Sequence, residues 1–260
     1  MFRNTNFGVL MRKVGGFYGF NWRSLDYFCF FAKSKPTKNR INMNNHQEHE
    51  FVDLGLPSGT LWATCNVGAK NPEDCGDFFA WGEIKPKTYY DYGTYKYCKI
   101  KKRLFKKNDW LFTKYCGQAK YGYGGFTDNR TILLPEDDAS AAYWGNGWRM
   151  PTKEELEELY SKTIHTWTTQ TGVYGRRFTA RNGNSIFLPY AGFRFQDGFV
   201  GFGNNGYYWS SSLSTDNPYC ASYFYSRFCG HFRFGSPCFM IDWGSNRASG
   251  LPVRAVRSEY

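Results

Sequence analysis

Residues 145–159 read GNGWRMPTKEELEEL and contain the clearest helix start in the chain. Thr152 and Glu155 match the S/T-x-x-E capping box, in which the two side chains satisfy backbone N–H groups at a helix N-terminus. Leu156 and Leu159 predict one buried helix face. Four acidic side chains are expected to stay in solvent: Glu154, Glu155, Glu157 and Glu158. Acids are favoured at the positive end of a helix, so we interpret them as surface charges and not as catalytic carboxylates.

Short apolar runs separated by turn residues surround this helix. FVDLGLPSGTLWATCNVGA (51–69) predicts a strand, a turn and a second strand. A second helix is expected near Asp137–Tyr143, and residues 85–130 predict long loops. From Thr166 onward the pattern is all-β, with SIFLPY (185–190) as a central strand.

The composition predicts one or two globular domains. The chain has 260 residues, 42% of them apolar and 20% aromatic, with 28 glycines, which favours a loop-rich structure held by aromatic anchors. Residues 33–50 are polar and linker-like. Translation starts either at Met1 or at Met43. We therefore expect residues 1–49 to be a disordered linker or upstream extension, and residues 50–260 to form the ordered domain.

Charge and cysteine usage exclude several kinds of site. The net charge of +11 is concentrated in residues 1–42, which carry +7, whereas residues 43–260 carry only +4. A nucleic-acid partner is not expected from so mild a balance, and the run Lys99–Lys107 is interpreted as a solvated loop and not as a phosphate or membrane patch. The eight cysteines form no CxxC pair, so neither a structural zinc site nor another cofactor is predicted.

The sequence shows neither a membrane-spanning segment nor a good signal peptide. No apolar run is long enough to cross a bilayer. The apolar stretches 14–22 and 25–32 are interrupted by Arg23 and Asp26, which makes a poor signal peptide.

Residues 222–234 (SYFYSRFCGHFRF) alternate between two kinds of side chain. One parity carries Phe224, Phe228, Phe232 and Phe234. The other carries Tyr223, Tyr225, Arg227, Cys229, His231 and Arg233. Because a strand sends alternate side chains to opposite faces, the phenylalanines are expected to face a core and the second set to face solvent. Tyr and Arg are enriched in binding surfaces, although an ordinary half-buried strand has the same pattern.

Residues 210–250 contain no Lys, Glu or Gln, whereas residues 43–209 contain 26 of them in 167 positions. The codons of these three residues end in a purine. An Asn codon randomised at its two adenines, with its final pyrimidine kept, cannot encode them. Met240 and Trp243 do not fit that scheme and would have to be fixed positions. The deficit therefore predicts a diversified segment.

Seven motifs together carry a family resemblance. They are FVDLGLPSGTLWATCNVGA (51–69), GDFFAWGE (76–83), LPEDDASAAYW (134–144), GNGWRMPTKEELEEL (145–159), GNSIFLPYAGFR (183–194), GYYWSSS (206–212) and GLPVRAVR (250–257). The chain resembles the bacterial major paralogous domain family, common in gut Bacteroidetes and their phages, over residues 50–258. The segment WRMPTKEEL is also similar to formylglycine-generating-enzyme-like proteins, which have a C-type-lectin-like fold.

The resemblance implies an α+β, C-type-lectin-like domain with short antiparallel sheets, two helices and long loops. It also implies a ligand-reading surface, because some proteins of this lectin-like group are variable proteins of diversity-generating retroelements, in which adenines near the 3′ end of the gene are rewritten. The variable region would be about 207–250. The implied ligand-binding positions are Tyr219, Cys220, Ser222, Tyr223, Tyr225, Arg227, Cys229, His231, Arg233, Ile241, Asp242, Gly244, Ser245, Ala248 and Ser249. The implied scaffold includes Trp62, Trp81, Trp148, Trp209 and the 251–257 strand.

The predicted function is therefore a non-enzymatic, receptor- or adhesin-like protein that binds a protein or glycan on a cell surface. It is expected outside the cell, on the cell surface or on a phage virion. An enzyme resembling the formylglycine-generating group is the alternative, but His165 and His231 have no recognisable nucleophile motif, and Cys220, Cys229 and Cys238 lack the wider active-site pattern. A calcium-dependent lectin is a third possibility, although Asp216–Pro218 reads as a turn. A purely structural surface or virion component is the fourth.

Overall fold

The computed structural model describes residues 49–102, 109–145, 147–227, 239–241 (backbone only) and 244–258. All of them belong to the compact unit Asn45–Tyr260. His49, which the sequence assigned to the linker, stacks on Trp144 with ring centroids 4.0 Å apart. Packing therefore begins at least as early as His49.

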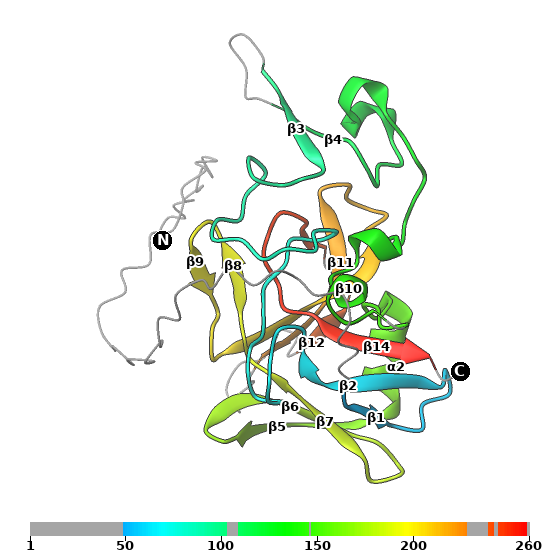
Figure 1. The fold of residues 1–260 in the computed structure, drawn as a ribbon, viewed down its shortest axis with the longest axis vertical. Coiled ribbons are helices and arrows are strands. Elements are labelled where there is room, and N and C mark those ends of the chain that lie inside the picture. Colours follow the sequence, from blue (N-terminus) through cyan, green and yellow to red (C-terminus); the bar gives the residue numbers. More distant parts are fainter. Residues whose placement is uncertain (1–48, 103–108, 146, 228–238, 242–243, 259–260) are drawn as a thin grey trace, which may run out of the picture. The chain divides into compact units, whose positions relative to one another are not determined.

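The first and last strands of the unit lie in one antiparallel sheet. Its order is β1 (Phe51–Asp53), β2 (Thr60–Asn66) and β14 (Arg254–Ser258), with β2 in the middle (Figure 1). The strand, turn and strand predicted for 51–69 are confirmed. Gly55 and Gly59 have positive φ angles of 59° and 68°, which the turn between β1 and β2 requires.

Hydrogen bonds from a buried arginine of β14 join this sheet to a strand of a second sheet. Arg254 is 1% exposed. Its Nε donates to Asn66 Oδ1 at 2.9 Å, and Nη1 donates to the carbonyl oxygens of Ala63 (3.1 Å) and Thr64 (3.0 Å) in β2. Nη2 donates to the Phe187 carbonyl at 3.0 Å. No carboxylate among the described residues pairs with it, so backbone and amide oxygens satisfy the guanidinium.

The strand that receives Nη2 is β7 (Ser185–Pro189), in a second sheet of order β5 (Ile164–Gln170), β6 (Val173–Thr179) and β7. The prediction of a central strand for residues 185–190 is wrong in one respect, because β7 lies at the end of its sheet. It is nevertheless buried along Ile186, Phe187 and Leu188, and this burial explains its continuous apolar sequence.

Two α-helices precede these strands, near the expected positions. They are α1 (Ala139–Trp144) and α2 (Lys153–Lys162), and a 3₁₀ turn, η3 (Pro135–Asp137), leads into α1. The capping box of Thr152 and Glu155 is present. Leu156 and Leu159 are 1% and 0% exposed and pack with Trp62, Phe178, Phe224 and Val256. Burying each leucine contributes about 1.5–3 kcal/mol.

A third sheet carries most of the predicted variable region. Its strands are β10 (Asn205–Leu213), β11 (Cys220–Arg227), β12 (Phe239–Ile241) and β13 (Ser245–Asn246), and β11 pairs with the other three. Two hairpins complete the fold: β3 (Cys98–Lys101) with β4 (Asp109–Phe112), and β8 (Phe193–Phe195) with β9 (Gly198–Val200). The 3₁₀ turns η1 (Ala119–Tyr121) and η2 (Tyr123–Gly125) follow β4.

Tryptophans join distant segments inside this framework. Trp81 Nε1 donates to the Ser210 carbonyl at 2.9 Å, and Trp209 Nε1 donates to the Phe79 carbonyl at 2.7 Å. Trp62, Trp81 and Trp209 are fully buried and Trp148 is 4% exposed, so the predicted scaffold role of the four is consistent with their burial. The described part is thus mostly β, with small antiparallel sheets and few helices, which confirms the α+β class. Within it, no helix has the length and apolar character needed to cross a membrane.

We predict that Arg254→Met lowers the free energy of unfolding by about 2–4 kcal/mol, because it leaves several buried oxygens without a donor. The control is Arg181→Met, at an exposed position, which should change stability by less than about 0.5 kcal/mol. Urea unfolding followed by tryptophan fluorescence measures both. Equal stability of the two variants would contradict the role given to Arg254.

Candidate ligand-binding face

The inner face of β11 is a core face, as its alternation predicts. Phe224 is fully buried, with ring centroids 5.7 Å from Phe178 and 6.4 Å from Tyr208. Ser226, on the same parity, is also buried, and its hydroxyl lies 3.0 Å from the Tyr190 hydroxyl. The prediction is confirmed for Phe224, while Phe228, Phe232 and Phe234 lie outside the described residues.

The opposite face of β11 carries a group of stacked tyrosines, together with Tyr207 of β10. Tyr207 pairs with Tyr225 in the strand register. Its ring stacks on Tyr223 at 5.9 Å and 14°, and it meets Tyr225 at 5.0 Å and 46°. Phe193 of β8 packs edge-on against it at 4.9 Å. We call Tyr207, Tyr223 and Tyr225 the tyrosine group.

The hydroxyls of the tyrosine group stay protonated at neutral pH. Burial raises the pKa of Tyr223 to about 12 and also raises the pKa values of Tyr207 and Tyr225. The Arg227 charge and its hydrogen bond to Tyr225 act in the other direction on Tyr225 without reversing this shift. Each phenol can therefore both donate and accept a hydrogen bond. Tyr207, Tyr225 and Arg227 are half-buried, so they combine apolar rings with polar tips at the surface.

Tyr219 centres a neighbouring aromatic cluster just before β11. Its ring lies 5.2 Å from Phe112, 5.7 Å from Tyr92 and 5.6 Å from Tyr121. Its hydroxyl donates to the Trp110 carbonyl at 3.2 Å, and the Tyr92 hydroxyl donates to the Tyr219 carbonyl at 2.8 Å. Tyr219 is half-buried, so it contributes to the surface while it holds the β3–β4 segment against the start of β11.

Four proposed contact positions are interior, which corrects the expectation that they are exposed. Ser222 is 1% exposed, Tyr223 9%, Ala248 0% and Ser249 3%. Ser222 shares the core-facing parity of Phe224, whereas Tyr223 lies on the opposite face and is covered there, where its ring stacks on Tyr207. Ala248 and Ser249 belong to the segment that closes on the 79–81 loop, where Trp81 N donates to the Arg247 carbonyl at 2.9 Å.

The remaining candidates divide into three groups. Cys220 and Ser245 are half-buried, and Gly244 is exposed. Ile241 lies in β12, where its backbone pairs with Phe224. The candidates outside the described residues are Cys229, His231, Arg233 and Asp242. A turn forms over Asn217–Cys220, one residue later than the turn predicted for Asp216–Pro218: Cys220 N donates to the Asn217 carbonyl at 2.9 Å and Tyr219 N to Asn217 Oδ1 at 3.0 Å.

Arg247 was not among the predicted site residues, yet it is the most unusual group near the face. It is fully buried. Its guanidinium carbon lies 3.6 Å from the Phe112 ring centroid, and Nη1 donates to the Tyr115 carbonyl at 3.0 Å. Nε and Nη2 have no hydrogen-bond partner in the described part of the chain. Its burial could not be read from sequence, because residues 244–250 have no regular period.

Among the described cysteines, the two whose pKa is shifted, Cys98 and Cys220, give no sign of an activated nucleophile. The five described cysteines are free thiols. Burial raises the pKa of Cys220, with Arg247 opposing, and raises the pKa of Cys98 to about 12. A raised pKa leaves little thiolate at neutral pH, and the thiolate is the nucleophile. No group of three or more His, Cys, Asp or Glu side chains in the described ranges is arranged to hold a metal ion.

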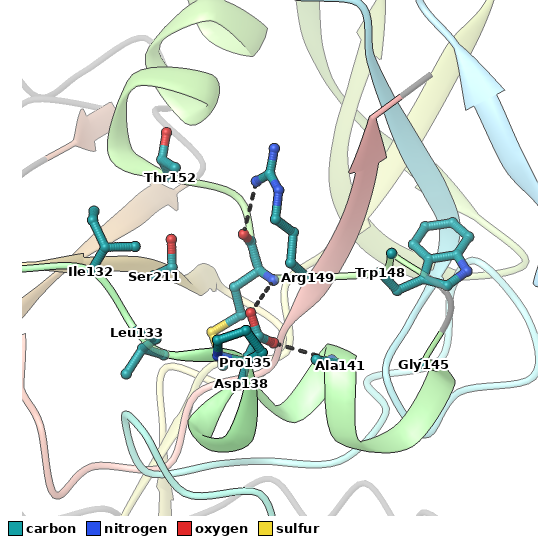
Figure 2. A pocket seen from close by; sticks show the side chains of 12 residues that line it. Ile132, Leu133, Pro135, Asp138, Ala141, Gly145, Trp148, Arg149, Thr152 and Ser211 are labelled. Carbon is teal, nitrogen blue, oxygen red and sulfur yellow. Dashed lines mark hydrogen bonds between the residues drawn. The ribbon is translucent and has the colours of Figure 1, made fainter. Parts of the chain in front are cut away.

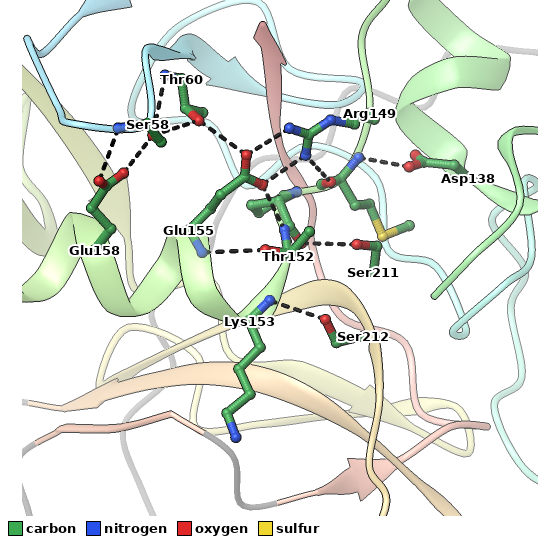
Figure 3. A network of polar contacts seen from close by, with 12 residues as sticks. Ser58, Thr60, Asp138, Arg149, Thr152, Lys153, Glu155, Glu158, Ser211 and Ser212 are labelled. Atoms are coloured by element: carbon green, nitrogen blue, oxygen red, sulfur yellow. Dashed lines mark hydrogen bonds and ion pairs between the residues drawn. The ribbon is translucent and has the colours of Figure 1, made fainter. Parts of the chain in front are cut away.

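A polar network fixes the N-terminus of α2 (Figure 3). Both Arg149 Nη atoms donate to the Glu155 carboxylate at 2.6 Å, and Thr60 Oγ1 donates to it at 3.0 Å. Ser58 donates to Glu158 from its backbone N at 3.0 Å. The expectation that all four glutamates are solvated is therefore wrong for Glu155, whose side chain is 13% exposed. Each of these groups has a structural partner.

A hollow of about 480 Å³ lies beside Trp148 (Figure 2). Its described lining residues are Ile132, Leu133, Pro135, Asp138, Ala141, Gly145, Gly147, Trp148, Arg149, Met150, Thr152 and Ser211. The polar atoms there are engaged: the Asp138 carboxylate accepts from Ser140 N at 2.8 Å and Met150 N at 2.7 Å, and Ser211 Oγ donates to the Pro151 carbonyl at 3.3 Å. The hollow can accept an apolar group but presents no free reactive pair.

Comparison with known proteins adds no relative: the chain matches no protein-family model, no curated protein and no solved structure.

We predict that Glu155 makes stability depend on pH. Burial raises its pKa, but the Arg149 and Thr152 hydrogen bonds and the Arg149 charge outweigh this, so the folded-state pKa lies below the ordinary 4.5. The resulting stability is present above the unfolded pKa and is lost as pH falls through the folded pKa. Between pH 6 and pH 3, wild type should lose about 1–2 kcal/mol more than Glu155→Gln, a modest figure because Arg149 is 35% exposed.

Urea unfolding at each pH measures this difference. Glu157→Gln is the control, because Glu157 is 50% exposed and lies 3.9 Å from Lys153. It should follow the wild-type pH dependence. A Glu155→Gln variant with the wild-type pH slope would show that the pair with Arg149 contributes nothing.

A further prediction concerns Gly244, which the resemblance assigned to the variable set. A Cβ at this position would lie 2.2 Å from the Cys220 Cβ. Gly244→Ala should therefore lower the free energy of unfolding by about 1–3 kcal/mol, as expected for overpacking. Cys220→Gly removes the opposing Cβ and should restore part of the loss in the double variant. Full stability of Gly244→Ala alone would mean that the position tolerates variation.

Proposed function

We propose that the chain is a non-enzymatic, receptor- or adhesin-like binding protein with a C-type-lectin-like scaffold and a diversified surface near its C-terminus. Its ligand is a protein or glycan on a cell surface, and it acts outside the cell, on a cell surface or on a phage virion. It needs no cofactor for this role. The resemblance to the bacterial major paralogous domain family motivates the proposal, and the physical support comes from β10 and β11.

The observation that carries the proposal is the tyrosine group on a rigid support. Tyr207 and Tyr225 are partly exposed, while Phe224 and Tyr208 of the same strands are buried in the core behind them. Aromatic rings held in this way lose little conformational entropy on binding and offer a large contact area. Arg227 adds a cation at the end of the strand, and Arg is among the residues enriched in binding hot spots.

The architecture agrees with the short sheets, two helices and long loops that the resemblance implies. β1 and β14, the first and last described strands, lie on either side of β2 in one sheet. The Arg254 hydrogen bonds join that sheet to β7. A support fixed in this way tolerates changes at surface positions, because substitutions away from special features cost little stability. The positions best placed to vary are Tyr219, Cys220, Tyr225, Arg227 and Ser245. The interior residues Ser222, Tyr223, Ala248 and Ser249 are left out of the contact set, and Tyr223 supports the partly exposed ring of Tyr207, on which it stacks.

The enzyme alternative has less support. Burial raises the pKa of Cys220, which makes its thiol a poor nucleophile at neutral pH. His165 stacks on Tyr160 at 4.1 Å, and its Nδ1 lies 3.1 Å from Arg176 Nη1. Burial and the Arg176 charge lower its pKa. An imidazole engaged by these partners is better explained as part of the packing than as a general base.

We predict that the full chain, fluorescently labelled, binds a subset of a glycan array or of intact Bacteroidetes cells through the tyrosine group. Tyr225→Ala and Arg227→Ala should each weaken that binding by about ten-fold or more, as expected for hot-spot residues. Tyr174→Ala is the control, because Tyr174 is 47% exposed in a different sheet, and it should retain binding.

Thermal unfolding of each variant confirms that it is folded before binding is measured. Wild-type binding that survives in both the Tyr225 and Arg227 variants, or that is lost equally in Tyr174→Ala, would contradict the proposed face. Turnover of a substrate that depends on Cys220 would instead favour the enzyme alternative.

A further inference from the structure

A hollow of about 530 Å³ is lined by residues of β3 and β4 and of the 3₁₀ turns η1 and η2 that follow them; Figure 1 labels the two strands. Its volume is within the usual range for small-molecule sites. Its lining brings together residues separated by more than ten positions: Lys101, Asp109, Leu111, Ala119, Lys120, Gly122, Tyr123, Gly124 and Gly125.

The floor of the hollow is held in place by specific contacts. Gly122 forms a parallel bridge to Phe112 of β4, and a Cβ on Gly122 would lie 1.8 Å from the Phe126 carbonyl oxygen. The Asp128 carboxylate accepts from Tyr115 N at 2.8 Å and Cys116 N at 3.0 Å, at the start of this segment. The turn at Gly122–Gly125 is therefore held against β4, and only glycine fits at position 122.

Positive charge and an aromatic ring meet at this hollow. Lys99, Lys101 and Lys120 are exposed, and Lys99 Nζ lies 4.9 Å from the ring centroid of Tyr123. Lys120 Nζ lies 4.7 Å from the Tyr121 ring. Tyr123 is 46% exposed. Asp109 is the one acid among the described lining residues, so these cations outnumber the negative charge.

We propose that this hollow is a second binding site, which takes an anionic sugar residue of a sulfated or carboxylated polysaccharide. The sulfate or carboxylate meets Lys101 and Lys120, and the sugar ring lies against Tyr123. A small inorganic anion is a poorer candidate than a charged sugar, because it would make no use of the exposed ring of Tyr123. A nucleic acid would call for a basic stripe, whereas these lysines border one hollow on a domain of net charge only +4.

The probe for this site is a fluorescent heparin hexasaccharide titrated with the full chain. Lys101→Gln and Lys120→Gln should each weaken binding by about two- to five-fold, the range for exposed ion pairs. Lys162→Gln, at an exposed lysine of α2, is the control and should leave binding unchanged.

A matched pair at Gly124 tests the hollow itself. Gly124 has φ +64°, and a Cβ there would meet no atom within 4 Å. Asn and Asp both tolerate this conformation. Gly124→Asp, which adds a negative charge, should weaken binding by about five-fold or more, and Gly124→Asn should bind within about two-fold of wild type. Equal binding by the Asp and Asn variants would overturn the site.

The other outcomes also decide the assignment. No binding of the hexasaccharide, or equal binding of an uncharged dextran oligosaccharide, would overturn an anionic sugar site. Displacement by inorganic sulfate at the same charge concentration would overturn the part given to Tyr123. Tighter binding of a DNA duplex, lost in the same lysine variants, would overturn the polysaccharide class. Tyr225→Ala and Arg227→Ala should not affect this binding, so the two proposals fail separately.

Discussion

The guanidinium of Arg254 is the interaction on which the fold most depends. It is buried without a carboxylate among the described residues, and burial lowers its pKa to about 10, so it remains charged at neutral pH. The cost of burying that charge is offset by donation to oxygens of β2 and of β7. Because Arg254 belongs to β14, its hydrogen bonds tie this last described strand both to β2 of its own sheet and to β7 of the second sheet. Separation of either sheet would leave a buried cation and several carbonyls unsatisfied.

Hydrogen bonds between distant segments explain how a chain rich in loops can hold a surface in one rigid conformation. Long loops separate the sheets, but Trp81 and Trp209 connect the 79–81 loop to β10 through hydrogen bonds to backbone carbonyls. β10 in turn pairs with β11, so the tyrosine group is held by a continuous set of packed strands. In the proposed function, this rigidity is what allows exposed side chains to change while the fold stays constant.

Features set by local chemistry could be predicted from the sequence. The capping box located α2 because its hydrogen bonds involve residues only three apart, and strand alternation placed Phe224 in the core. What covers the other face of a strand depends on tertiary packing, so the burial of Tyr223, Ala248 and Ser249 and of the Arg247 guanidinium could not be read from periodicity. Ser222 differs, because it shares the parity of Phe224 and the alternation itself predicts that it is buried. The apolar run at 185–190 predicts a central strand, but a strand at the end of a sheet can be buried equally well when other segments cover it. The sequence analysis singles out the basic run that contains Lys101, but the hollow that Lys101 lines with Lys120 and Tyr123 joins segments without regular period and could not be predicted.

The structure also gives a second explanation for the absence of Lys, Glu and Gln from residues 210–250. Many described positions there are buried, including Ser210–Ser212, Ser222 to Phe224 and Ala248–Ser249, and long polar side chains are disfavoured in such places whatever the gene does. Burial restricts residue types at interior positions, whereas diversification leaves its mark on the codons of exposed ones.

Sequencing the gene, its flanking DNA and its sister copies separates these two causes most directly. The account predicts a nearby reverse-transcriptase gene and a near-identical repeat that differs only at adenines. It also predicts that differences between copies fall at the codons of Tyr219, Cys220, Tyr225, Arg227 and Ser245 and spare those of Ser222, Tyr223, Ala248 and Ser249. Differences spread evenly over all four bases and over buried and exposed codons alike, with no such repeat, would contradict it.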